Sequence, residues 1–107
     1  MFKEKVIMKK IILLCAAGMS TSLLVSNMKK ASKEQGLEYD IAAYPVAEAE
    51  KVASDAAAVL LGPQVRFAVK DVQSKLPNVP VDSIDMRDYG TMNGKKVLAK
   101  AQSMIID

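Results

Sequence analysis

The part of the sequence that says most about the fold is Lys10-Ile-Ile-Leu-Leu-Cys-Ala-Ala-Gly-Met-Ser-Thr-Ser-Leu-Leu-Val25. Its first part, residues 10–15, is an apolar run of the length expected for a strand buried on both faces. Small and hydroxyl-bearing residues follow, and these are typical of a tight turn that leads into a helix. Apolar residues then recur at helical spacing, so residues 20–35 are predicted to form a helix that Gly36 ends.

The same alternation continues along the rest of the chain. Further strands are predicted at residues 38–43, 57–61 and 79–84, further helices at 46–54, 63–76 and 93–106, and a loop at 85–91. Four strands that alternate with four helices indicate a three-layer α/β domain with a parallel sheet. Short right-handed crossovers favour the flavodoxin-like strand order 2-1-3-4, and Pro80 favours an edge position for the last strand.

Length and composition are those of one globular domain. The chain has 107 residues, a formal charge of +3 from 15 basic and 12 acidic residues, and 50% hydrophobic residues. A chain of about 100 residues can bury a core without disulfides or a metal ion. We expect one domain over residues 8–107, preceded by an extension over residues 1–7, with Met8 as an alternative start.

The residues that the chain lacks exclude several chemistries. It has no histidine, which excludes histidine-liganded zinc and a Ser-His or Cys-His catalytic pair. Cys15 is the one cysteine, so an intramolecular disulfide and a CxxC pair are excluded, and a reducing, cytosolic compartment is expected. Acidic residues interleave with the basic ones and no aromatic platform accompanies them, so nucleic-acid binding is not expected.

The turn after Cys15 is the strongest candidate for a functional site. In the order 2-1-3-4 the winding reverses between the first and third strands, and ligands bind at the carboxyl ends of strands that flank such a point. The loops after Cys15 and at Gly62 are expected to meet there. Backbone N–H groups, a helix N-terminus and the hydroxyls of Ser20, Thr21 and Ser22 favour a bound anion. The same field favours the thiolate form of Cys15, which makes it the candidate nucleophile.

Each of these features also has a purely structural explanation. A free cysteine at a strand end is usually a small buried hydrophobe, and Ser-Thr-Ser before a helix is usually an N-cap. Their coincidence on the first turn of a doubly wound domain favours the anion site. The predicted phosphate-binding residues are Ala16, Ala17, Gly18, Met19, Ser20, Thr21 and Ser22.

Other residues near this end are weaker candidates. Gln64 and Tyr89 are predicted to contact the second loop or a partner, although a solvated glutamine and a shielding tyrosine fit equally well. Arg66 is expected to make a surface pair. Asp85 and Asp88 lack further ligands, so they predict loop caps and no metal site.

The spacing of the turn resembles the phosphate loop of the low-molecular-weight tyrosine phosphatases, Cys-x5-Arg-Ser/Thr. Ser22 stands at the hydroxyl position, whereas Thr21 stands where those enzymes have arginine. That arginine clamps the phosphate and stabilises transferring charge, so its absence argues against efficient hydrolysis. A phosphatase or arsenate-reductase-like enzyme is therefore the alternative function. A nucleotide- or flavin-binding module is third, because the chain lacks GxGxxG.

Residues 11–25, together with Val59-Leu-Leu-Gly-Pro-Gln64, resemble the IIB component of the bacterial phosphoenolpyruvate:sugar phosphotransferase system (PTS). The resemblance is to the lactose/cellobiose (N,N′-diacetylchitobiose) class and covers nearly the whole chain from Met8 onward. It implies that Cys15 takes a phosphoryl group from the phosphohistidine of a IIA protein. The group then passes to a sugar in the membrane-embedded IIC transporter.

The same resemblance implies several further properties. The protein is expected to be a cytoplasmic monomer that needs no cofactor and associates with the membrane only through IIC. It is also expected to be a convex domain with its nucleophile exposed at one end. The sugar is left open, because specificity would reside in IIC.

Overall fold

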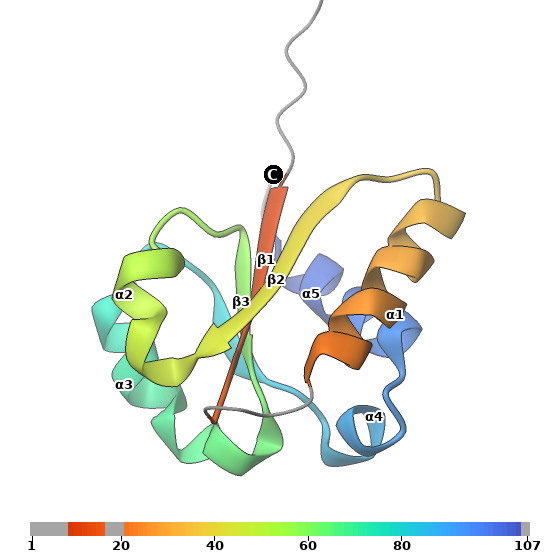
Figure 1. Cartoon of the computed structure of the whole chain (residues 1–107). Helices are drawn as coiled ribbons and strands as arrows, with labels where there is room; N and C mark the ends of the chain where they lie inside the picture. Colours follow the sequence, from red (N-terminus) through yellow and green to blue (C-terminus); the bar gives the residue numbers. More distant parts are fainter. Residues whose placement is uncertain (1–8, 17–20, 106–107) are drawn as a thin grey trace, which may run out of the picture.

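Four parallel strands form the centre of the molecule in the order β2-β1-β3-β4, which confirms the predicted topology (Figure 1). The computed structural model describes residues 9–16 and 21–105. The strands are β1 (Lys9–Cys15), β2 (Tyr39–Pro45), β3 (Ala58–Leu61) and β4 (Val81–Ser83). The short β4 lies at an edge, as predicted from Pro80, because proline has no backbone N–H to donate to a neighbouring strand.

Helices cover both faces of the sheet (Figure 1). The helical elements are α1 (Thr21–Glu34), η1 (Val46–Glu48), α2 (Ala49–Val52), η2 (Pro63–Ala68), α3 (Val69–Lys75), α4 (Met86–Gly90) and α5 (Gly94–Met104). The pair α1 and α5 lies on one face, and α2 and α3 lie on the other, which gives the predicted three layers. No helix within the described ranges is long and apolar enough to cross a membrane.

The helix predicted over 46–54 is divided into η1 and α2, and two other predicted elements differ more from the structure. Residues 85–91 were expected to form a loop, but they contain α4, which begins because the Asp85 carboxylate accepts hydrogen bonds from the backbone N–H groups of Arg87 and Asp88 at 3.0 and 3.1 Å. The single helix expected over 63–76 is interrupted at Val65, whose φ of −118° and ψ of 20° are not helical. The chain is α-helical only from Val69 onward.

The core lies on both sides of β1, whose side chains alternate between the two layers. Ile11 and Leu13 pack with α1, α4 and α5, whereas Ile12 and Leu14 pack with α2, η2 and α3. All four are at most 2% exposed. Each such burial contributes roughly 1.5–3 kcal/mol, so the central strand is held in place from both faces. This fixes the position of the residue at which β1 ends.

Candidate functional site

The candidate site lies at the carboxyl end of the sheet, where β1 ends and α1 begins (Figure 1). Cys15 is the last residue of β1 and Thr21 is the first residue of α1. The Cys15 Sγ lies 3.5 Å from the Thr21 Oγ1, and the thiol donates a second, longer hydrogen bond of 3.7 Å to the carbonyl oxygen of Tyr44 in β2. The two ends of the turn are therefore joined through the sulfur.

The thiol is buried, which corrects the expectation of an exposed nucleophile. Cys15 is 6% exposed and Thr21 is 5% exposed. The physical reason is the place of β1 in the sheet: Cys15 is paired with Pro45 of β2, and the first turn of α1 covers it. A reagent in bulk solvent therefore has little access to this sulfur.

The electrostatic setting comes from the orientation of α1. The helix has 14 residues, and its N-terminus is the end that meets Cys15. Its first turn contains no acidic residue and its last turn carries Lys33, so no carboxylate opposes the positive field of the N-terminal N–H groups. Such a helix end favours an anion beside it.

Part of the predicted phosphate-binding turn cannot be placed. Ala17, Gly18, Met19 and Ser20 lie outside the described residues. Ala16 is half-buried and Ser22 is exposed. Thr21 and Ser22 also line one end of a groove of about 580 Å³ between α1 and the edge strand β2. The role of these residues as phosphate ligands stays a prediction.

The second loop begins beside the end of β1, next to Cys15. The backbone N–H of Gly62, directly after β3, donates a 2.8 Å hydrogen bond to the carbonyl oxygen of Leu14. Gln64 is exposed at the start of η2, and its Oε1 would lie 3.0 Å from a Cβ on Gly62. Arg66 is exposed in the same element. The residue that follows β3 is therefore hydrogen-bonded to β1 one residue before Cys15, whereas the predicted meeting of the two loops involves residues 17–20, which lie outside the described residues.

Tyr89 lies closer to this junction than its sequence position suggests. It belongs to α4 and is 8% exposed, in the core layer shared with α1 and α5. Its Cε1 would lie 3.6 Å from a Cβ on Gly62. Asp85, four residues earlier, is the N-cap of α4, in agreement with the predicted cap. The part of the chain that the structure describes holds no group of three or more acidic or cysteine side chains that could bind a metal ion.

Three exposed apolar side chains surround the same end, and the sequence analysis missed them. Leu23 of α1 is 55% exposed, Phe67 of η2 is 83% exposed and Met86 of α4 is 62% exposed. All three elements meet at the carboxyl end of the sheet (Figure 1). A signal existed for Phe67, because it lies off the buried stripe of Val65 and Val72, but periodicity alone does not say whether such a residue is covered.

Comparison with known proteins agrees with this geometry. The family model of the lactose/cellobiose-specific IIB subunit of the PTS matches residues 10–100. The galactose-specific EIIB component of Lactococcus lactis subsp. cremoris is 46% identical over 104 residues, which cover 91% of this chain and 96% of that protein. The cellobiose-specific EIIB component of Lactococcus lactis subsp. lactis is 45% identical with the same coverage.

A solved structure supports the same assignment. The solution structure of the cellobiose-specific phosphotransferase IIB component from Borrelia burgdorferi has a TM-score of 0.75 and 38% sequence identity, and the match covers 91% of each chain. The region matched by the family model begins within β1 and ends within α5, so it includes Cys15, Gly62 and Tyr89. The chain therefore belongs to the lactose/cellobiose-specific IIB subunit family of the phosphoenolpyruvate:sugar phosphotransferase system.

Proposed function

We propose that Cys15 is the residue through which this sugar phosphotransferase subunit carries the phosphoryl group. The observation that supports the proposal most is the position of the thiol. It ends the central strand 3.5 Å from the hydroxyl that opens α1, at the helix end that favours an anion. The chain has no second cysteine and no histidine to take this role.

The chemistry is two displacements at phosphorus. The Cys15 thiolate attacks the phosphohistidine of a IIA protein, so an S–P bond forms, the P–N bond breaks and the imidazole nitrogen leaves with its electron pair. A sugar hydroxyl at IIC then attacks phosphorus, so an O–P bond forms, the S–P bond breaks, the hydroxyl proton is released and the thiolate returns. The Thr21 hydroxyl can donate to the sulfur in its thiolate form and so stabilise the leaving group of the second step.

The family assignment does not favour the phosphatase alternative, and the site suggests why the phosphoryl group would be retained. Thr21 stands where the tyrosine phosphatases have arginine, and it is held against Cys15 inside the protein. A neutral hydroxyl cannot supply the charge that a guanidinium offers to a phosphoryl group under attack by water.

We further propose that IIA and IIC dock on the apolar surface formed by Leu23, Phe67 and Met86. IIB components act with IIA and IIC partners in general, and each partner must reach Cys15 at this end. Large apolar side chains that are more than half exposed and gather at one end of a molecule are the kind of surface that binds a partner. The polar backbone of the phosphate turn would then be surrounded by an apolar rim that excludes water during transfer.

The remaining expectations follow the same proposal. The IIB domain would span residues 8–107, with residues 1–7 as an extension that lies outside the described residues. The protein would act as a cytoplasmic monomer without a cofactor, reaching the membrane through IIC. Its sugar would belong to the cellobiose, chitobiose or lactose class, in keeping with the family.

The test is phosphorylation by the complete relay. The protein is incubated with phosphoenolpyruvate, the general phosphotransfer proteins and a IIA protein of the same class, and its intact mass is measured beside that of Cys15→Ser. One phosphoryl group that persists for minutes on the wild type and is absent from the variant is expected. Turnover of an aryl phosphate without any added mass would instead identify a phosphatase.

A further inference from the structure

The Tyr89 hydroxyl is a polar group at the carboxyl end that lacks a hydrogen-bond partner among the described residues. The side chain is 8% exposed, and buried tyrosine hydroxyls normally find a partner. Even the half-buried Tyr39 has a partner, because its hydroxyl oxygen accepts a 3.3 Å hydrogen bond from the Nε2 of Gln102. Within residues 9–16 and 21–105 no fully buried side-chain oxygen or nitrogen is left without a partner. The unpartnered Tyr89 oxygen must therefore reach the surface while its ring stays in the core.

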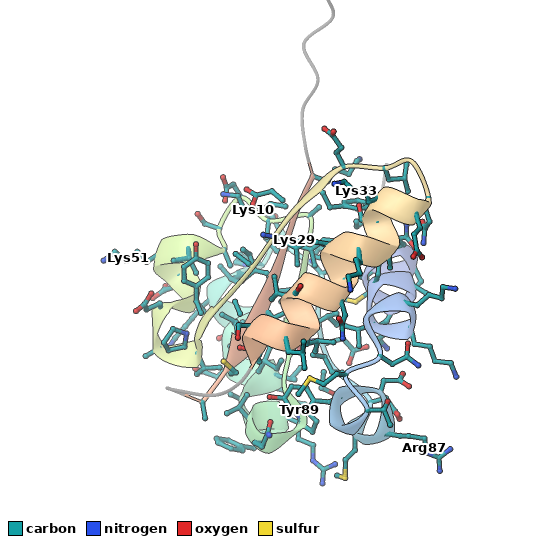
Figure 2. The ribbon with its side chains drawn as sticks, turned by 45° about the vertical axis from the view of Figure 1, so that its right-hand side comes forward. Lys10, Lys29, Lys33, Lys51, Arg87 and Tyr89 are labelled. Carbon is teal, nitrogen blue, oxygen red and sulfur yellow. The ribbon has the colours of Figure 1, made fainter. Side chains whose placement is uncertain are left out.

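The hydroxyl-bearing half of the ring lies beside Gly62, next to the candidate site. Tyr89 packs in one cluster with Leu13 of β1 and Leu24 of the first turns of α1. Its Cε1, next to the carbon that carries the hydroxyl, is the ring atom beside Gly62. The backbone N–H of Gly62 in turn donates a hydrogen bond to the carbonyl oxygen of Leu14, the residue before Cys15. Figure 2 shows Tyr89 at the opposite end of α1 from Lys33, which is the end where the phosphate turn joins the helix.

We propose that the Tyr89 hydroxyl donates a hydrogen bond to the phosphoryl group on Cys15, an inference that rests on the proposed function. The phosphoryl group would bring the acceptor that the hydroxyl lacks in the unmodified protein. A hydrogen bond from a neutral donor to an anionic oxygen is stronger than one between neutral groups.

This role would complement the replacement of arginine by Thr21. A phenol donates one directed hydrogen bond without adding a positive charge. It would therefore hold the phosphocysteine in place without making the phosphorus as open to attack by water as a guanidinium would. Tyr89 would stabilise the phosphorylated form relative to the free thiol, and so favour transfer from IIA to this subunit.

The test is the equilibrium of phosphoryl transfer between phosphorylated IIA and this protein, read by intact mass after both directions have converged. Tyr89→Phe keeps the ring and removes the hydroxyl. We expect it to lower the equilibrium constant about 10-fold, with a melting temperature close to that of the wild type. An equilibrium constant does not depend on docking, so a variant that affects only partner binding changes the rate and leaves this value unchanged.

Tyr39→Phe is the matched control, because it removes a hydroxyl that is already bonded, at the far end of the molecule. It is expected to leave the transfer equilibrium unchanged. Equal constants for the wild type and Tyr89→Phe would overturn the inference and leave a hydrated hydroxyl. Failure of the wild type to accept phosphate would overturn the proposed function instead.

A measurement on the wild type removes any dependence on the folding of the variant. With 13Cζ-labelled tyrosine, phosphorylation of Cys15 is expected to shift the Tyr89 resonance, because its hydroxyl gains an acceptor, and to leave that of Tyr39 in place. A Tyr89 resonance that stays fixed while the phosphorus signal of phosphocysteine appears would contradict the proposed hydrogen bond.

Discussion

The polar side chains around Cys15 are paired less closely than those at the amino end of the sheet. At the amino end, Lys10 pairs with Asp55 at 3.0 Å, and the Ser32 hydroxyl donates a 2.8 Å hydrogen bond to the carbonyl oxygen of Leu37. The Gln102 side chain adds hydrogen bonds to Gln35 and Tyr39. At the carboxyl end, the Cys15 thiol has only long contacts of 3.5 and 3.7 Å, and the Tyr89 hydroxyl has none within the described residues.

Exposed apolar side chains follow the same division. Leu23, Phe67 and Met86 lie at the carboxyl end, whereas Leu37, which is 41% exposed, is the one large apolar side chain of comparable exposure at the amino end among the described residues. Groups that are paired inside the chain contribute to stability, whereas unpaired groups are available to a partner or ligand. This difference is the one expected if the amino end closes the fold and the carboxyl end holds the proposed phosphoryl-transfer site.

The largest expected effect on stability belongs to the helix layer that joins the two ends. A Cβ on Gly94 would lie 2.4 Å from the backbone carbonyl carbon of Asn27, so Gly94→Ala must push α5 away from α1. We expect a loss of about 3 kcal/mol in the free energy of unfolding, measured by urea denaturation.

Gly90→Ala is the control for that substitution, since nothing lies within 4 Å of its Cβ position. It should leave the free energy of unfolding within about 0.5 kcal/mol of the wild type. If both variants unfold alike, the close approach of α1 and α5 is not what limits position 94.

A smaller effect, on function alone, is expected at the carboxyl end. Phe67→Ser removes an apolar side chain that is 83% exposed, so it should leave the melting temperature nearly unchanged. Because interface aromatic residues often dominate binding, we expect the KM for phosphorylated IIA to rise about 10-fold. The measurement is the initial rate of phosphoryl transfer as a function of the IIA concentration.

Leu37→Ser makes the same kind of change at the amino end and is the control for Phe67→Ser. Its KM for IIA is expected to equal that of the wild type. If Leu37→Ser and Phe67→Ser raise the KM equally, partner docking is not confined to the carboxyl end.

The smallest effect is expected from the exposed ion pair of the amino end. The hydrogen bond from Lys10 holds the pKa of the Asp55 carboxyl below its ordinary value of 3.8. A lowered pKa in the folded state means that this contribution is present above pH 3.8 and is lost as the pH falls through the lower folded value. Asp55→Asn should therefore lower the melting temperature slightly at pH 7, with a difference that shrinks toward pH 3 and in high salt. A difference that grows in acid would contradict this sign.

The strand order and the position of the site could both be predicted from the sequence, because they depend on local patterns. The apolar run over 10–15 predicted a strand buried on both faces, and the small residues after Cys15 predicted a tight turn before a helix. The family motif around Cys15 and at Gly62 pointed to the same end of the sheet. The helix at 86–90 was missed because its start depends on how the Asp85 side chain folds back on the backbone.

The fold class, the topology and the residue expected to carry the phosphoryl group could be predicted from the sequence alone. Each of them depends on the order and spacing of residues that are close together in the chain. Three properties could be seen only in the tertiary structure: Cys15 is buried, Phe67 is exposed, and the Tyr89 hydroxyl has no hydrogen-bond partner among the described residues. Burial and pairing depend on residues far apart in the chain, here on β2 and α1 around the sulfur and on Gly62 beside the ring. Periodicity records only which face of an element a residue lies on, so it carries no information about what covers that face.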